Sequence, residues 1–319
     1  MRNVPDISAL MQPPHLHLEG ACPLPHLGLL RCSGDDAVSF LHNQLTQDLA
    51  LLDSSHARLA GYCNAKGRLQ ATFVLFKRSA DEVLLVCRKD LLPATLKRLS
   101  MFVLRAKARL SDASGDFALW GLAGSCAAPA TGTSSPWLRF QTGEADIVSL
   151  YPCQGQARAL WIGPAQQTPQ GPPLAHADWL AGEVLSGVAD VQQATFEAFV
   201  PQMLNLESVG GVNFKKGCYP GQEVVARSQF RGTLKRRTYL VSGPEALQAG
   251  QEVYHSADAT QPCGLIAQAA SFTQDGQTHH LALAALQISA TQAGRLHLAQ
   301  ANGAVLTQLA LPYVLREDL

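Results

Sequence analysis

The chain has 319 residues, of which 47% are hydrophobic and 16% charged, and this is the composition of an ordinary globular protein with a large core. Its 25 basic and 25 acidic residues cancel, so the overall charge gives no reason to expect DNA or an anionic membrane as a partner. A chain of this length suits two or three domains.

Cysteine usage narrows the possible metal chemistry. The eight cysteines are scattered, and no two of them stand in a C-x-x-C spacing, so zinc-ribbon, thioredoxin-like and common cluster-binding motifs do not occur. His15 and His17 lack a third ligand partner nearby, and we expect no resident metal. Scattered thiols, no apolar leader segment and no run of roughly 18 apolar residues predict a cytoplasmic protein with reduced cysteines and no membrane helix. We also expect a monomer.

The sequence pattern of the N-terminal third predicts a mixture of helices and strands. Residues 1–25 are rich in proline and histidine and are expected to form a loose extension. An apolar run at 27–32 predicts a strand, and the acidic segment 33–36 supplies the cap of a helix. Apolar residues at spacings of three and four are expected to form the buried face of that helix. They are Val38, Leu41, Leu45, Leu49 and Leu52.

The middle of the chain alternates strands, loops and helices. Residues 64–67 (NAKG) are a typical hairpin turn between strands. Residues 103–110 alternate apolar residues with Arg105, Lys107 and Arg109, which predicts a half-buried strand whose cations face solvent or, alternatively, an anionic ligand tail. Loops rich in glycine, proline, serine and threonine are expected at 124–136 and 163–173. The other predicted elements are strands at 58–63, 68–77, 82–87 and within 137–162, and helices at 90–102 and 178–185.

Trp179 lies on the last of these helices. A tryptophan there is either a core anchor, which is its commoner role, or a wall on which a flat ligand stacks. Beyond residue 237 the chain has short apolar runs about ten residues apart, which predict a small antiparallel barrel or sandwich. These runs are 238–241, 252–255, 264–272, 279–288 and 295–298.

The segment 216–223 (KGCYPGQE) has a composition that no helix or strand would favour. Its glycines and proline indicate a specified turn. Cys218 has lysines two and three residues before it and Arg227 nine residues after it, and nearby positive charge favours a reactive thiolate. A single cysteine is also commonly a small buried hydrophobe, so residue chemistry alone leaves both readings open.

Residues 227–237 contain five cations: Arg227, Arg231, Lys235, Arg236 and Arg237. Such a run usually marks a solvated face, and a nucleic-acid contact is the alternative. If the segment after Gly221 is helical, Glu223 and Arg227 can form an ion pair four residues apart. The chain has no phosphate loop, H-E-x-x-H helix or G-x-S-x-G elbow, so any chemistry is expected near Cys218.

The block GGVNFKKGCYPGQEVVAR at 210–227 resembles the signature of the YgfZ/GcvT-related folate-binding proteins. The resemblance continues at 33–49, at the hairpin turn 64–68, at 199–206 and at 311–313, and so covers the chain from Leu27 to the C-terminus. It implies an α+β, three-lobed aminomethyltransferase-like fold with a C-terminal antiparallel β-barrel. The domains implied are a flexible extension at 1–25, a folate-binding region at 26–237 with a second lobe inserted at about 53–135, and the barrel at 238–319.

The resemblance also implies a function. Family members act as folate-binding accessory proteins in the assembly or repair of iron–sulfur proteins, including enzymes that modify tRNA. The implied cofactor is tetrahydrofolate or a derivative, and the implied partners are iron–sulfur proteins or their assembly machinery. Lys216 and Cys218 fall on the functional pair of the motif, with Cys218 expected at the mouth of the folate pocket. Supporting motif residues are Gly217, Tyr219, Gly221, Gln222, Glu223 and Arg227, and the expected folate contacts are Trp179, Leu27 and Arg105.

The alternative function is one-carbon transfer. Aminomethyltransferases of the same fold carry a paired-aspartate motif after the hairpin glycine, and one of those carboxylates acts on the folate. Here the corresponding residues are Gln70 and Ala71. We therefore expect the accessory role rather than aminomethyl transfer, and whether the chain catalyses a reaction stays open.

Overall fold

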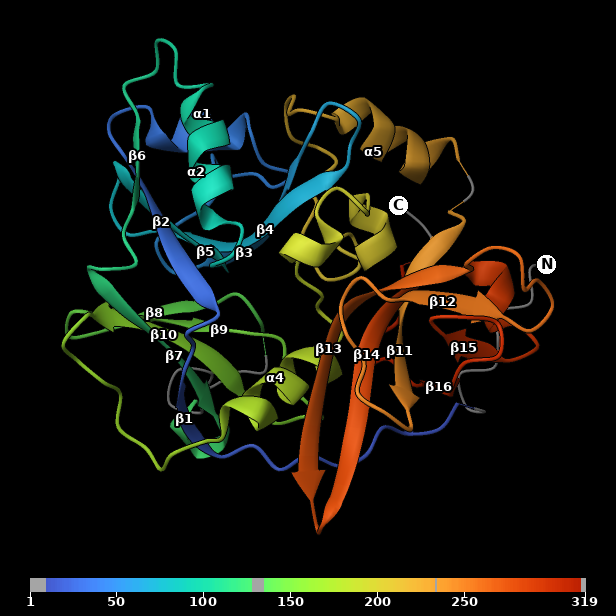
Figure 1. Cartoon of the computed structure of the whole chain (residues 1–319). Coiled ribbons are helices and arrows are strands. Elements are labelled where there is room, and N and C mark those ends of the chain that lie inside the picture. Colours follow the sequence, from blue (N-terminus) through green and yellow to red (C-terminus); the bar gives the residue numbers. More distant parts are fainter. Residues whose placement is uncertain (1–9, 128–134, 233, 317–319) are drawn as a thin grey trace.

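Three β-sheets organise the computed structural model, which describes residues 10–127, 135–232 and 234–316 (Figure 1). Two sheets are open and five-stranded, and the third is a closed barrel. Every pairing between named strands is antiparallel. The expected α+β class and C-terminal antiparallel barrel are confirmed.

The first sheet has the strand order β3-β4-β5-β2-β6. Successive side chains of its strands point to opposite faces, and both faces are buried. Helices α1 and α2 cover one face, and the rest of the protein covers the other. The NAKG turn joins β3 to β4 as expected. The elements are β2 (Leu27–Ser33), α1 (Ala37–His42), β3 (Ala57–Cys63), β4 (Leu69–Lys77), β5 (Glu82–Arg88), α2 (Leu92–Ser100) and β6 (Arg109–Asp112).

The sequence predicts a first helix that reaches Leu52, and this prediction is too long. Helix α1 ends at His42, although Leu45, Leu49 and Leu52 are buried as their spacing suggested. The chain leaves the helix because Thr46 binds other backbone: its N–H donates to the Gly61 carbonyl at 3.0 Å and its hydroxyl to the Gly211 carbonyl at 2.7 Å. These leucines therefore pack from a docked loop.

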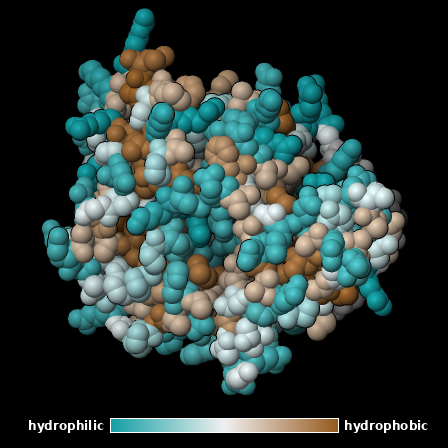
Figure 2. Space-filling model, in the orientation of Figure 1, coloured by the Kyte–Doolittle hydropathy of each residue, from teal (hydrophilic) through white to brown (hydrophobic). Residues whose placement is uncertain are grey.

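The prediction of a strand at 103–110 is also wrong for most of its length, since β6 begins only at Arg109. Lys107 is held by Asp36 instead: its N–H donates to the carboxylate at 2.7 Å, and its carbonyl accepts the Asp36 N–H at 3.1 Å. The preceding loop projects from the surface and carries exposed apolar side chains, which form the brown patch at the upper left of Figure 2. They include Met101, Phe102 and Leu104.

The second sheet has the strand order β1-β7-β10-β9-β8. Its first strand corrects the prediction of a loose extension at 1–25, because Leu16 and Leu18 are buried and β1 pairs with β7. The side-chain amides of Gln154 and Gln156 accept the backbone N–H groups of Leu16 and Leu18, which holds this segment in place. Residues 1–9 lie outside the described residues. The strands are β1 (Gly20–Pro23), β7 (Phe117–Ala123), β8 (Arg139–Thr142), β9 (Ala145–Ser149) and β10 (Arg158–Pro164).

The barrel has the strand order β11-β14-β13-β12-β15-β16 and closes because β16 pairs with both β11 and β15. The sequence predicted every barrel strand except β16. The strands are β11 (Arg236–Gly243), β12 (Glu252–His255), β13 (Gly264–Gln274), β14 (Gln277–Gln287), β15 (Leu296–Leu298) and β16 (Val305–Leu309). The short 3-10 helices in the described residues are η2 (Gly124–Cys126), η3 (Gln193–Thr195), η4 (Pro201–Leu204) and η5 (Ile288–Thr291).

Helix α4 (His176–Leu185) lies where the three sheets meet (Figure 1). Trp179 on this helix packs so closely on β7 that a Cβ atom at Gly121 would lie 2.5 Å from its ring. One apolar cluster runs through α4, both open sheets and the barrel. The expected lobe at 53–135 does not coincide with one sheet. The first sheet also contains β2, which precedes residue 53, and β7, which falls within 53–135, belongs to the second sheet. The domain boundaries stay a prediction. In the described part of the chain, no helix has the length and apolar character needed to cross a membrane.

Candidate functional site

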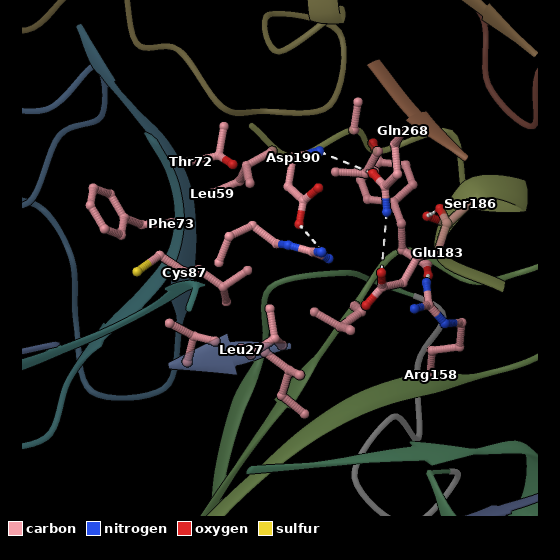
Figure 3. Close-up of a pocket in the computed structure, with 18 of the residues that line it drawn as sticks. Leu27, Leu59, Thr72, Phe73, Cys87, Arg158, Glu183, Ser186, Asp190 and Gln268 are labelled. Atoms are coloured by element: carbon pink, nitrogen blue, oxygen red, sulfur yellow. Dashed lines mark hydrogen bonds and ion pairs between the residues drawn. The ribbon is translucent and has the colours of Figure 1, made fainter. Parts of the chain in front are cut away.

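A pocket lies between the two open sheets, α4 and barrel strand β13, near the hollow at the centre of Figure 2. Its empty volume is about 650 Å³, part of which is open to solvent. One wall is apolar, and Figure 3 shows that Phe73 and Cys87 in that wall turn their side chains away from the cavity. The apolar wall includes Leu27, Leu59, Val74, Val86, Leu150 and Leu160.

Glu183 is the centre of a hydrogen-bond network at the opposite wall, and Figure 3 shows its contact with Gln268. Its Oε1 accepts from Trp179 Nε1 at 2.9 Å and lies 3.2 Å from His26 Nε2, while its Oε2 accepts from Gln268 Nε2 at 3.2 Å. His26 Nδ1 in turn contacts His176 Nε2 at 2.9 Å. Burial alone raises the pKa of Glu183, but the hydrogen bond from His26 and the nearby charges of His26, Arg158 and Arg88 bring it below its ordinary value.

Asp190 and Arg88 form a second charged pair in the pocket, with 3.7 Å between Asp190 Oδ2 and Arg88 Nη1. Within the described residues, Asp190 Oδ1 and Arg88 Nε have no hydrogen-bond partner. Burial raises the pKa of Asp190 to about 6, against the opposing charge of Arg88. The pocket therefore has an unused acceptor and an unused donor side by side, as a ligand with both kinds of polar group would need.

The expected folate residues fall in three different places. Leu27 lines the pocket. Trp179 does not; it is fully buried one layer behind, where the Arg158 guanidinium lies 4.4 Å from its ring, so it has the core role and also supports Glu183. Arg105 lies on the exposed loop after α2 and does not line the pocket. The aromatic side chains at the pocket are instead those of Trp137 and Tyr151, since the Phe73 ring turns away from the cavity.

Cys218 lies in the loop before α5 (Gln222–Phe230) and is exposed. Six other cysteines are buried, Cys126 is half-buried, and burial raises the thiol pKa of the buried six. Those thiols are held in their neutral, unreactive form. The buried-hydrophobe reading of Cys218 is therefore wrong, and Cys218 is the one fully accessible thiol of the described chain.

The loop around Cys218 is fixed by its neighbours. Gly221 has φ +80°, and a Cβ atom there would lie 2.4 Å from the Asn64 carbonyl oxygen and 2.6 Å from Gly67, so the position requires glycine. Tyr219 is buried, and the Gln222 side chain donates to the Lys216 carbonyl at 3.4 Å. The turn predicted for this segment is confirmed, and the segment after it is helical, as α5.

Lys216 is buried beneath the loop. Its ammonium group donates to the carbonyl oxygens of His42 and Leu45, the second at 2.7 Å, and lies 4.9 Å from the centre of the Tyr219 ring. Burial lowers the pKa of Lys216 to about 8, although the charge of Asp48 opposes this shift. Lys216 thus ties the Cys218 loop to the end of α1.

Lys216→Met should destabilise the protein by about 1–3 kcal/mol at neutral pH, because two carbonyl groups lose their donor. Since the pKa of Lys216 is lowered on folding, the unfolded chain binds its proton more tightly, and the lysine contributes more stability as pH rises through 8. The gap between wild type and variant should widen by on the order of 1 kcal/mol from about pH 7 to about pH 9.5, after allowance for solvent screening. Urea unfolding at both pH values measures it; a constant gap would contradict the buried contact.

The Cys218 loop and the pocket are separate features. The loop packs on the hairpin turn at Gly67, whereas the pocket begins at Thr72 on the same hairpin. Thr72 is five residues after Gly67, which is roughly 17 Å of extended chain at about 3.3 Å per residue. Cys218 is not among the residues that line the pocket.

The other motif residues lie on the surface near the start of α5. Gly217, Glu223 and Arg227 are exposed. No ion pair joins Glu223 to Arg227 in the described structure, so the expected pair does not form. Arg237, at the end of the basic run, is buried and pairs with Glu207 at 2.7 Å, so it belongs to the core rather than to a solvated face.

Comparisons with known proteins give this chain curated relatives and a solved structure of similar fold. No family model matches the chain. The tRNA-modifying protein YgfZ of Photobacterium profundum is 30% identical over 316 residues, which cover 90% of this chain and 89% of that protein. The tRNA-modifying protein YgfZ of Edwardsiella ictaluri is 32% identical over 229 residues, or 67% of this chain and 68% of that protein. The chain belongs to the YgfZ family.

A solved structure extends the comparison to the fold. The glycine cleavage system aminomethyltransferase T from Bartonella henselae superposes with a TM-score of 0.61, covering 93% of this chain and 86% of that one, at 13% sequence identity. At this identity the match shows a shared fold. The aminomethyltransferase-like fold expected for this YgfZ family member is therefore confirmed.

Sequence reasoning missed most of the charged residues of the pocket. Arg88 is one residue beyond the predicted strand 82–87. Because side chains alternate between the two faces of a strand, it lies on the same face as Val86. Glu183 is four residues after Trp179 on a helix whose neighbouring residues are apolar, so a charge at this position was a usable signal. Asp190 and Arg158 had no comparable local signal.

Proposed function

We propose that this chain is a folate-binding accessory protein that supports the assembly or repair of iron–sulfur proteins, including enzymes that modify tRNA. The observation that carries the folate part is the pocket at the junction of the three sheets, in which Asp190 Oδ1 and Arg88 Nε lack partners among the described residues. The shared fold with an aminomethyltransferase supports the same site.

The pocket residues fit the two ends of a reduced folate. A pterin has an amino group and an adjacent ring N–H on one edge, and a carboxylate such as Asp190 can accept from both. The apolar wall around Leu27 and Val86 suits the flat ring, and Arg88 beside Asp190 can donate to an acceptor on the same ring edge. Arg158 suits a carboxylate of the glutamate tail. Glu183 already accepts from three side chains, so its role is to hold the wall in place.

Asp190→Asn should weaken folate binding about tenfold or more at about pH 7.5, because a charged hydrogen-bond acceptor is lost. Wild-type affinity should also fall as the pH drops below about 6, where Asp190 becomes protonated, whereas the Asn variant should show little change. Isothermal calorimetry at about pH 5 and about pH 7.5 measures both effects. Equal affinity of the two proteins at both pH values would remove Asp190 from the site.

The link to tRNA modification rests on the relatives, which are named tRNA-modifying proteins, and the link to iron–sulfur proteins on the exposed thiol of Cys218. A thiolate is a soft ligand and a good nucleophile, suited to iron–sulfur chemistry. The same proposal places the protein in the cytoplasm, where thiols stay reduced.

A bacterial strain that lacks its own YgfZ-type protein tests this link. Expression of this chain should restore a tRNA modification made by an iron–sulfur enzyme. A modification made in the same strain by an enzyme without a cluster is the control and should not change on deletion or rescue. If the deletion lowers both modifications alike, the link to cluster enzymes is wrong.

Aminomethyl transfer is the weaker candidate. Gln70, which replaces one of the paired aspartates, donates to Glu197 Oε1 at 2.6 Å, and Ala71 is buried in the apolar cluster beneath α1 and α2. Neither residue lines the pocket. These positions therefore offer no carboxylate to a bound folate.

A further inference from the structure

The exposed side of α5 combines unpaired cations with an aromatic ring. Arg231 follows Arg227 by about one helical turn, and both side chains are exposed. Phe230 between them is 55% exposed, and Val224 on the preceding turn is 38% exposed. With Lys66 and Lys215, these residues form what we call the α5 patch.

Contacts between neighbouring elements bring the parts of the patch together. The hairpin turn that carries Lys66 packs on α5, since a Cβ atom at Gly67 would lie 3.0 Å from Val224. Phe230 meets Phe214 edge to face, with ring centres 5.4 Å apart, and Phe214 directly precedes Lys215. Cys218 lies between Lys215 and the start of α5, so the accessible thiol is inside this patch.

The charge of the patch is strongly one-sided, although the whole chain is neutral. Its four cations are Lys66, Lys215, Arg227 and Arg231. The acids near them are the exposed Glu223 and the half-buried Glu197, whose charge interacts with that of Lys66. In the described residues none of the four cations is within ion-pair distance of a carboxylate. Unpaired cations held beside one another favour a polyanionic partner.

We propose that the α5 patch binds single-stranded RNA directly. The four cations suit successive phosphates, and the exposed face of Phe230 suits an unstacked base. An acidic protein would satisfy the cations but gives no reason for an exposed aromatic ring among them. The inference deepens the proposed function, because it makes RNA a ligand of the surface that carries Cys218; it does not depend on the folate pocket.

The binding test uses a short fluorescein-labelled single-stranded RNA and the full chain, with fluorescence anisotropy between about 50 and about 200 mM salt. Contacts to three or four phosphates predict that log K falls with log salt at a slope of about −2 to −3, and Arg227→Ala should reduce the slope by about 0.7. Phe230→Ala should lower affinity about tenfold, since one base loses its stacking partner. The matching duplex should bind more weakly than the single strand.

Matched controls come from the same chain. Arg295→Ala removes an exposed cation outside the patch, and Phe140→Ala removes an aromatic side chain that is 37% exposed on β8; both should bind RNA like wild type. If Phe230→Ala proves unstable, Phe230→Leu keeps an apolar contact with Phe214 but lacks the ring face, and the same loss of affinity is expected. Bound RNA should also slow alkylation of Cys218 by iodoacetamide.

Three results would overturn the proposal. The first is no saturable RNA binding at low salt, and the second is that Arg295→Ala weakens RNA binding as much as Arg227→Ala does. The third is that polyglutamate binds as tightly as RNA and that Phe230→Ala has no effect on RNA binding. The last would identify an acidic-protein site. Failure of RNA binding would leave the folate titration unaffected, so the two claims fail separately.

Discussion

Cys218→Ala is expected to abolish rescue of the iron–sulfur-dependent tRNA modification while the free energy of unfolding changes by less than about 0.5 kcal/mol. The physical reason is that Cys218 is exposed, so its removal leaves no cavity, and that the other cysteines are buried or half-buried and cannot replace its chemistry. Rescue in the deletion strain and guanidinium unfolding of the purified variant measure the two halves of this prediction.

Two further variants sharpen the result. Cys218→Ser keeps the size and polarity of the side chain but not the thiol, and it should fail in the same way as alanine. Cys126→Ala removes a half-buried thiol elsewhere and should rescue fully. Full rescue by Cys218→Ala would show that the thiol is dispensable, and a large loss of stability would show that it has a structural role.

Glu183→Ala is expected to cause the largest loss of stability of any substitution considered, about 3–5 kcal/mol or failure to fold. The carboxylate accepts from Trp179, His26 and Gln268 at once, and the charge of Arg158 lies close by. Removing it leaves the Trp179 indole N–H and the Gln268 amide without their acceptor. Denaturant unfolding and the yield of folded protein provide the measurement.

Glu183→Gln separates the charge from the shape of the side chain. It keeps one carbonyl acceptor at nearly the same position, so we expect a smaller loss, of about 1–3 kcal/mol. Asp190→Asn is the matched control in the same pocket and should cost less still, because burial already disfavours the charged form of Asp190 at neutral pH. A Glu183→Ala protein as stable as wild type would contradict the network described here.

The fold was largely predictable because most of its elements have local signals. The strands of the first sheet and the barrel are short, mostly apolar runs bounded by turn residues, and the NAKG turn specifies its hairpin. The helix expected to reach Leu52 shows the limit of such signals: leucines at helical spacing were buried as expected, but Thr46 bonds to Gly61 and Gly211, which are distant in sequence, and these bonds end the helix early.

The pocket was much less predictable than the motif. Cys218 and Lys216 stand in one continuous segment whose composition marks a specified turn, whereas Arg88, Asp190 and Gln268 come together only because two sheets and the barrel dock around α4. Leu27, which the family resemblance gives as a folate contact, does line the pocket. The resemblance could not place Trp179 behind the wall or Arg105 on an outer loop, because both outcomes depend on packing between distant elements.

Titration of the purified full-length chain with tetrahydrofolate under reducing conditions, followed by calorimetry and by tryptophan fluorescence, tests the central claim most directly. Trp137 lines the pocket, so its fluorescence should change on binding, and Trp137→Phe should remove most of that signal. We predict saturable binding of one folate per chain, weakened by Asp190→Asn. No saturable heat or fluorescence change at millimolar folate would contradict a folate site in this pocket.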